Sequence, residues 1–175
     1  MAIYTKKGDK GKSRVFDSND LIFKDGQIFA TIGTIDELNS VLGVCKSFFS
    51  NKQTVKMLEQ IQSNLFTIGS ILAGAKIKLQ RDQVTKLERE IDRMEGTLPV
   101  LANFILPGGT KAAGFLHLAR SIARRAEREV VEYSRRKQVD PEILVYLNRL
   151  SDFLFMLARL ENFKRKVTAT IWKAN

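Results

Sequence analysis

The sequence predicts a single all-α domain, a five-helix bundle that follows an irregular N-terminal segment. Apolar residues recur every three or four positions over most of the chain after Thr34, which is the spacing of a buried helix face. Capping and proline signals divide this region into five parts. Of the 175 residues, 44% are hydrophobic, which is enough for one core. We therefore expect an N-terminal segment over residues 1–33, a bundle over 34–165 and a tail over 166–175.

The first three helices are expected to begin at Thr34, Thr54 and Asp82. Thr34 and Glu37 have the spacing of a capping box, in which the N-cap hydroxyl and the N3 carboxylate satisfy each other's backbone N–H groups. Apolar stripes then follow in each helix. They comprise Leu38, Val41, Leu42 and Cys45 in the first, Val55, Leu58, Ile61, Leu65 and Ile68 in the second, and Val84, Leu87, Ile91 and Met94 in the third.

Glycine and proline residues mark where the last two helices are expected to begin. Residues 96–109 hold two of the three prolines and are expected to form a loop, which ends in Pro107-Gly108-Gly109. A helix then starts after Thr110 and runs over about residues 111–137. Asp140 followed by Pro141 is an N-cap with proline at N1, which begins a helix to about Phe163. Its apolar surface is broad, so it should lie centrally or at a subunit contact.

The fourth predicted helix carries a row of arginines. Arg120, Arg124 and Arg128 stand four residues apart, with Arg125 beside them, so their guanidinium groups share one face. Like charges at this spacing disfavour a helix unless carboxylates or a bound anion compensate them. Nearby glutamates permit a solvated basic face. Guanidinium forks also suit phosphate oxygens, and the preceding glycine loop favours that second interpretation.

The N-terminal segment is rich in glycine, lysine and aspartate, which a helical bundle does not require. It is typical of a loop whose backbone N–H groups and lysines approach a phosphate. Gly11-Lys12-Ser13 imitates the end of a P-loop, but that motif needs a glycine where Lys6 stands, so a P-loop is excluded. A flexible lysine-rich terminus is the other interpretation of the segment.

Composition limits the classes of function. Cys45 is the single cysteine and His117 the single histidine, so neither an intramolecular disulfide nor a cysteine metal cluster is expected. His117 is interpreted as a packed or edge residue. We see no apolar run of membrane-spanning length and no signal peptide, and so expect a cytoplasmic protein without a membrane partner. The net charge of +10 indicates anionic partners, but no nucleic-acid-binding motif is present.

Five blocks, in this order, resemble the PduO-type ATP:cob(I)alamin adenosyltransferases over nearly the whole chain. Each block is weak alone, but their order and spacing together are specific. Lys7 and Ile32 depart from the usual family residues without removing a phosphate-binding group. The blocks are Tyr4-Thr5-Lys6-Lys7-Gly8-Asp9-Lys10-Gly11, Gly33-Thr34-Ile35-Asp36-Glu37-Leu38-Asn39, Phe104-Ile105-Leu106-Pro107-Gly108-Gly109, Ala119-Arg120 with Arg124-Arg125-Ala126-Glu127-Arg128, and Tyr146-Leu147-Asn148-Arg149-Leu150-Ser151-Asp152.

The resemblance implies a homotrimer whose active sites lie between adjacent subunits. It implies that Asp36 pairs with Arg120 across the interface and that Phe104 lies beneath the corrin ring, so that Arg124, Asp36, Arg120 and Phe104 are the catalytic set. ATP would be bound by a loop of one subunit and the arginine helix of its neighbour. Those ATP-binding residues are Thr5, Lys6, Lys7, Gly8, Ser13, Arg14 and Lys24 in the loop, and Arg124, Arg125, Glu127, Arg128 and Asn148 in the helices.

The resemblance also implies the chemistry: cob(I)alamin attacks the 5′ carbon of ATP and triphosphate leaves, with Mg²⁺ beside the phosphates. No general base is needed, and the sequence offers no Ser-His-Asp or Cys-His set. An electron donor or reductase and an adenosylcobalamin-dependent enzyme are the further partners implied. Two other classes stay open: a helical protein that binds RNA or another polyanion, and a structural bundle. The bundle alone leaves the glycine-lysine loop and the Leu106-Pro107-Gly108-Gly109 segment unexplained.

Overall fold

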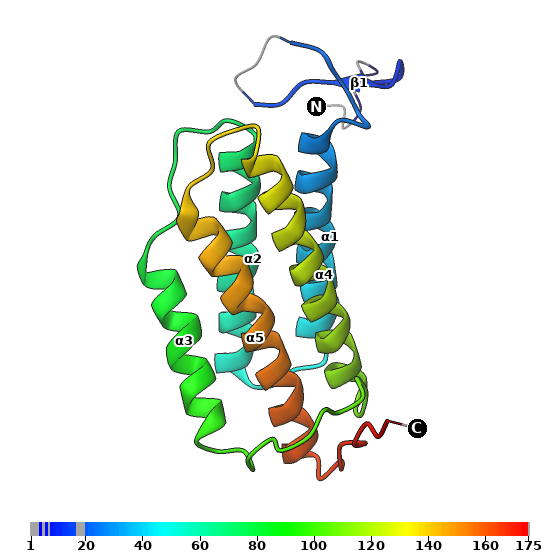
Figure 1. The fold of residues 1–175 in the computed structure, drawn as a ribbon, viewed down its shortest axis with the longest axis vertical. Helices are drawn as coiled ribbons and strands as arrows, with labels where there is room; N and C mark the ends of the chain where they lie inside the picture. Colours follow the sequence, from blue (N-terminus) through cyan, green and yellow to red (C-terminus); the bar gives the residue numbers. More distant parts are fainter. Residues whose placement is uncertain (1–3, 5, 7, 17–19, 175) are drawn as a thin grey trace.

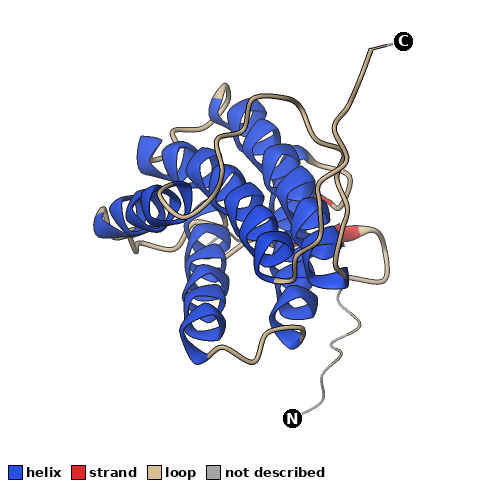
Figure 2. Cartoon of the chain, turned by 90° about the horizontal axis from the view of Figure 1, so that it is seen from below, coloured by secondary structure: helices blue, strands red, loops and turns tan. Residues whose placement is uncertain are grey.

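The computed structural model describes residues 4, 6, 8–16 and 20–174. Within them the chain forms five helices: α1 (Gln27–Ser47), α2 (Lys52–Leu72), α3 (Asp82–Glu95), α4 (Lys111–Ser134) and α5 (Pro141–Lys164). The helices lie roughly along one direction as a bundle (Figure 1). A short hairpin of β1 (Lys12–Ser13) and β2 (Ile22–Phe23) precedes them, and Figure 2 shows how small this sheet is beside the helices. The predicted all-α class and the number of helices are confirmed.

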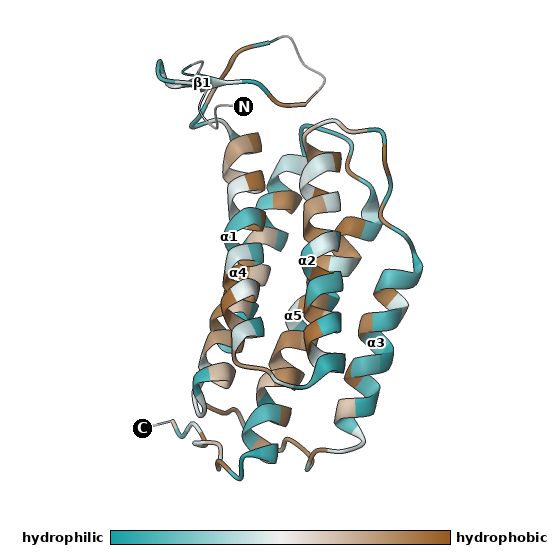
Figure 3. Cartoon of the chain, turned by 180° about the vertical axis from the view of Figure 1, so that it is seen from behind, coloured by the Kyte–Doolittle hydropathy of each residue, from teal (hydrophilic) through white to brown (hydrophobic). Residues whose placement is uncertain are grey.

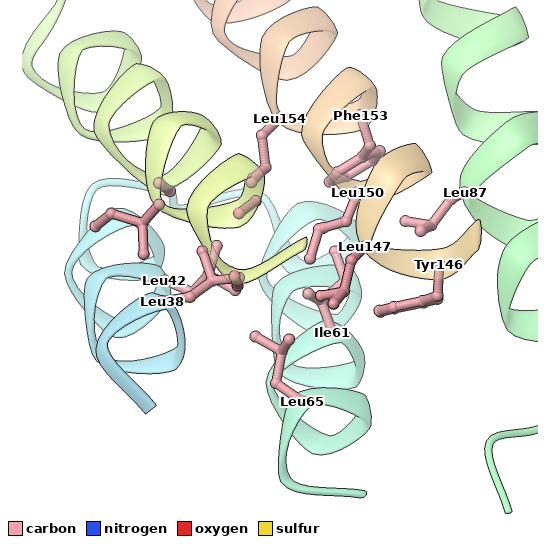
Figure 4. Close-up of a cluster of buried hydrophobic side chains, with 14 of the residues drawn as sticks. Leu38, Leu42, Ile61, Leu65, Leu87, Tyr146, Leu147, Leu150, Phe153 and Leu154 are labelled. Carbon is pink, nitrogen blue, oxygen red and sulfur yellow. The ribbon is translucent and has the colours of Figure 1, made fainter. Parts of the chain in front are cut away.

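The helices pack in a defined order. α1 contacts both α2 and α4, and α5 contacts both α4 and α3. α5 therefore lies between two other helices, as its broad apolar surface predicts, and α3 is the outermost helix, with a largely hydrophilic outer surface (Figure 3). Leucine and isoleucine side chains of α1, α2 and α5 fill the centre (Figure 4). The Tyr146 hydroxyl is buried there and accepts a hydrogen bond from Asn64 Nδ2 at 3.0 Å.

Three of the predicted helix starts are local signals that the structure confirms. The Thr110 side chain caps α4 by accepting from Ala113 N at 3.1 Å. Asp140 caps α5, where Oδ1 accepts from Glu142 N at 3.1 Å and Pro141 takes the first helical position. α3 begins at Asp82 as expected. α2 begins slightly earlier than predicted, at Lys52, and Asn51 caps it by accepting from Thr54 N.

The predicted start of the first helix at Thr34 is wrong. α1 begins at Gln27, after an extended Gly26 without a side-chain cap, so residues 27–33 belong to the bundle. Thr34 lies inside the helix, and its hydroxyl donates to Ala30 O at 2.9 Å. Glu37 does not reach back to form a capping box, because its carboxylate forms an ion pair with Arg125 of α4.

α1 has one property that the sequence analysis did not anticipate. Its length and a mean hydropathy of 1.3 would, by composition alone, suit a membrane span. In the bundle, however, its apolar residues pack against α2 and α4, and Leu38, Leu42 and Cys45 are fully buried. Burial raises the pKa of the Cys45 thiol to about 12. The apolar composition of α1 is therefore accounted for by the protein core.

Candidate functional site

The arginine face of α4 begins at a tightly fixed loop. Gly109 has a φ of 108°, and a Cβ there would lie 2.2 Å from Asn162 Oδ1, so only glycine fits. Asn162 of α5 accepts from Thr110 N at 3.0 Å and donates to Gly108 O at 2.9 Å. This buried amide therefore joins the glycine loop and the start of α4 to the end of α5, and it fixes the direction in which the arginines project.

A cavity of about 340 Å³ lies between this loop, α4 and α5, and we call it the Phe104 pocket. Three residues predicted from the resemblance, Phe104, Arg120 and Arg124, all line it. The structure thus brings together side chains from the loop and from two successive turns of the arginine face. The other lining residues are Leu101, Ile105, Pro107, His117, Ser151, Asp152 and Phe155.

Phe104 projects from a loop that the C-terminal tail holds in place. Ile105 forms an antiparallel bridge with Ile171, and Trp172 N donates to Phe104 O at 2.8 Å. The Trp172 ring meets the Phe104 ring edge-on, with 6.4 Å between centroids. Phe104 is nevertheless 80% exposed, so its ring does not anchor the loop in the core of this chain. An apolar ring presented in this way suits contact with a flat ligand or another subunit.

Arg120 lies deeper than its neighbours on the arginine face. Its pKa is lowered first by burial and then by the positive charge of Arg124. Its Nε atom is buried and has no hydrogen-bond partner among the described residues. Asp36, its predicted partner, is exposed on α1 and forms no hydrogen bond or ion pair with any described residue of the same chain. The expected pair is therefore not formed within one subunit.

A second cavity, of about 480 Å³, continues along α4, and we call it the Arg128 pocket. Arg124 lines both cavities. Asn148 of α5 donates from Nδ2 to Glu127 Oε1 at 3.0 Å, and the Arg128 guanidinium donates to Arg124 O at 3.0 Å. Four of the predicted ATP-binding residues thus meet here, whereas Arg125 points to α1. The lining comprises Arg124, Glu127, Arg128, Val131, Glu132, Arg135 and Asn148.

The N-terminal hairpin forms a compact loop of basic residues. Gly8 lies against Lys24, because a Cβ at Gly8 would come within 2.9 Å of Lys24 Nζ. Lys24 N also donates to Gly11 O at 3.0 Å, and Gly11 has a φ of 72°, which favours glycine. Ser13 pairs with Ile22 in the hairpin. Lys6 and Arg14 are exposed nearby, and the predicted contacts Thr5 and Lys7 lie outside the described residues.

One chain does not bring all the predicted ATP-binding residues together. The hairpin lies beyond the N-terminal end of α1, whereas the Phe104 loop and the C-terminal tail lie at the opposite end of the bundle (Figure 1). The arginine face of α4 runs between these ends. Gln27 Nε2 of α1 donates to Glu129 Oε2 at 2.7 Å, so the C-terminal end of the arginine face lies at the hairpin end of the bundle, although no described hairpin residue lines the Arg128 pocket.

Within the described residues, no group of three or more histidine, cysteine, aspartate or glutamate side chains could hold a metal ion. The carboxylates of the Arg128 pocket, Glu127 and Glu132, are single ligands at most. Mg²⁺ often keeps several waters and takes one or two carboxylates together with substrate phosphates. The residues present therefore fit a Mg²⁺ ion that arrives with a polyphosphate.

Sequence reasoning missed several lining residues. Ser151 and Asp152 stand in the last of the five blocks but were not assigned to the site, although their spacing from Asn148 on α5 was a usable signal. His117 was expected to be packed, and it is 4% exposed, but it also lines the Phe104 pocket. No local pattern in the sequence indicates that Trp172 lies beside Phe104.

Comparison with known proteins agrees with this arrangement. Curated relatives include the corrinoid adenosyltransferase of Bacillus subtilis, 41% identical over 93% of this chain and 87% of that protein, and MMAB of Bos taurus, 39% identical over 99% and 76%. PduO of Citrobacter freundii is 40% identical over 93% of this chain, which spans 50% of that protein.

Solved structures lead to the same family. A PduO-type ATP:corrinoid adenosyltransferase from Lactobacillus reuteri, in a variant with one phenylalanine replaced by alanine, was solved with cobalamin and ATP. It superimposes with a TM-score of 0.93 at 36% identity, over 99% of this chain and 100% of that one. A second variant complexed with ATP gives a TM-score of 0.90 at 38% identity, over 98% and 100%. The family model described as cobalamin adenosyltransferase matches residues 3–161, and the chain belongs to this family.

Proposed function

We propose that this protein transfers the 5′-deoxyadenosyl group of ATP to cob(I)alamin and releases triphosphate. Membership of the family supports the ATP-dependent adenosylation of a corrinoid. The observation in this chain that carries the proposal is the Phe104 pocket, in which an exposed aromatic ring and two arginines of one helix line the same cavity. An apolar ring suits the face of a corrin, and adjacent guanidinium groups suit a polyphosphate.

The reaction needs little acid–base chemistry from the protein. The reduced cobalt supplies the electron pair for the new bond to C5′, and the bond from C5′ to oxygen breaks as triphosphate takes its electrons. The protein must align C5′ with the cobalt and stabilise the charge that develops on the leaving group. Arg124 is suited to both tasks, because it lines the Phe104 pocket and the Arg128 pocket.

We assign the ATP phosphates to the Arg128 pocket of one subunit and to the N-terminal loop of another. Arg124, Arg128 and Asn148 would contact them on the helical side, with Arg125 and Glu127 beside them. Mg²⁺ would arrive with the polyphosphate and neutralise part of its charge. On the loop side the contacts would be Thr5, Lys6, Lys7, Gly8, Ser13, Arg14 and Lys24. Asp36 and Arg120 Nε have no partner among the described residues of one chain, which supports interfacial sites in a homotrimer.

The test of the function is anaerobic incubation with ATP, Mg²⁺ and chemically reduced cobalamin, followed by the visible spectrum. We expect cob(I)alamin absorption to fall and adenosylcobalamin absorption to rise only when ATP is present. A protein that binds ATP, RNA and inorganic polyphosphate alike, with steep salt dependence and no adenosylation, would be a polyanion binder instead. The cytoplasmic location, the reductase and a partner enzyme that uses adenosylcobalamin stay predictions.

A charge-swap experiment tests the interface. Asp36→Asn should lower turnover about tenfold or more, because it leaves the half-buried Arg120 of the neighbouring subunit without its partner. Asp36→Arg combined with Arg120→Asp should restore part of the activity, as measured by the same spectral assay. Asp92→Asn removes the same charge from the exposed surface of α3 and should leave turnover unchanged.

Two results would contradict the proposed interface. Strictly additive losses in the double variant would show that Asp36 and Arg120 do not interact. Sedimentation of the wild-type protein should give a trimer, and a monomer that turns over normally would contradict a site shared between subunits.

A further inference from the structure

The Phe104 pocket holds a second unpaired polar atom besides Arg120 Nε. His117 Nδ1 is buried and has no hydrogen-bond partner among the described residues, although the side chain is only 4% exposed. Folded proteins pair nearly all buried polar atoms, because an unpaired one loses its hydrogen bonds to water without compensation. The two residues that carry these atoms line one cavity, three positions apart along α4, and so indicate a polar subsite beside its apolar residues.

The His117 ring has a fixed place in this wall. It contacts the Phe155 ring of α5, with 5.9 Å between centroids, and both residues line the cavity. The charged groups that share the cavity are Arg120 and Arg124 of α4 and Asp152 of α5. Burial, and then the charge of Arg120, lowers the pKa of His117 below its ordinary value. The imidazole is therefore neutral at neutral pH, with one nitrogen that donates and one that accepts.

The two unpaired atoms have complementary capacities. Arg120 Nε can only donate, whereas a neutral imidazole nitrogen can accept or donate according to its tautomer. A primary carboxamide carries both a carbonyl oxygen and N–H groups, so one carboxamide can use both atoms. A corrin ring bears carboxamide side chains around its edge, and Phe104 lines the same cavity as His117 and Arg120. The corrin face and its edge would therefore be recognised by residues of one cavity.

We propose that His117, together with Arg120 Nε, hydrogen-bonds a peripheral carboxamide of the corrin ring and thereby sets the affinity for the corrinoid. This inference rests on the proposed function, because it assumes that the corrinoid occupies the Phe104 pocket. His117 is a binding residue in this proposal and takes no part in the transfer of the adenosyl group.

Three substitutions of His117 test the proposal. Asn has a polar atom close to the position of Nδ1, Gln has one close to the position of Nε2, and Leu has a similar size to Asn but no polar atom. We expect His117→Leu and His117→Gln to raise the KM for the corrinoid about tenfold, and His117→Asn to stay within about threefold of wild type. The KM for ATP and the thermal melting temperature should change little in His117→Asn and His117→Gln.

The choice of corrinoid separates the ring edge from the lower nucleotide. Cobinamide keeps the carboxamides of the ring but lacks the dimethylbenzimidazole nucleotide of cobalamin. His117→Leu should therefore raise the KM by the same factor for cobalamin and for cobinamide. A loss with cobalamin alone would assign His117 to the nucleotide and overturn the proposal.

Other results would also overturn it. An unchanged corrinoid KM in His117→Leu, or equal losses in His117→Asn and His117→Gln, would show that Nδ1 makes no such bond. If His117→Leu fails to fold, the comparison of Asn with Gln still decides. A wild-type protein that does not adenosylate cobalamin would contradict the proposed function itself, whereas an active wild type with a normal His117→Leu variant contradicts only the role of His117.

Discussion

Arg124→Ala is expected to lower the rate of adenosyl transfer about a hundredfold. Loss of one preorganised donor to a developing charge costs about 3 kcal/mol in the transition state. Arg124 lines both cavities, and in the proposed reaction its guanidinium would contact the triphosphate next to the bond that breaks. The measurement is single-turnover formation of adenosylcobalamin with saturating ATP and reduced cobalamin.

The stability of this variant should remain normal. Arg124 is exposed, its side chain forms no ion pair within the described residues, and its charge lies near Arg120. Arg136→Ala removes the same charge just beyond α4 and is the matched control. Near-normal turnover of Arg124→Ala, equal to that of Arg136→Ala, would mean that the arginine face is only a solvated surface.

Phe104→Ala is expected to separate substrate activation from folding. As the ring beneath cobalt, Phe104 would exclude the lower ligand and favour four-coordinate Co(II), which is more easily reduced. Without it, the spectrum of four-coordinate cob(II)alamin that forms with ATP should be lost, and reduction of the bound corrinoid should become slow. ATP titration should resemble that of wild type.

The solvent exposure of Phe104 determines how Phe104→Ala should affect stability. Replacing a fully buried phenylalanine by alanine lowers the free energy of unfolding by about 3–5 kcal/mol. Phe104 is 80% exposed, so its replacement should barely change the melting temperature. Phe66 of α2 is also exposed, and Phe66→Ala is the control that should keep the four-coordinate signal. A large drop in melting temperature with that signal retained would return Phe104 to a structural role.

Helix starts that depend on one side chain were predictable from the sequence. Thr110 and Asp140 accept from backbone N–H groups within three residues, so their patterns carry the information by themselves, whereas α3 begins at Asp82 without a side-chain cap. The start of α1 was not predictable in this way. Gly26 gives no side-chain cap, and Thr34 and Glu37 match a capping box while their side chains bond elsewhere. Here packing and an ion pair to α4 override a local signal.

The candidate site shows the same difference between features that local sequence predicts and features that depend on distant residues. The helical spacing of Arg120, Arg124 and Arg128 follows directly from the sequence, and two of these arginines line the Phe104 pocket. The environment of Phe104 depends on a bridge between Ile105 and Ile171, which are far apart in the chain. Such a pairing has no local signature, and an unpaired atom such as His117 Nδ1 becomes visible only once its surroundings are known.

The outer position of α3 has a consequence for the slow motions of the protein. α3 packs mainly against α5, with a hydrogen bond from Asn64 of α2 to Gln83 and an ion pair between Glu88 and Arg149 as further links. Its unfolding would expose only a small part of the core. α3 should therefore open as a separate cooperative unit, at a lower free energy than global unfolding. Because the arginine face lies on α4, which packs against α1 and α5, such an opening would leave the proposed ATP-binding surface intact.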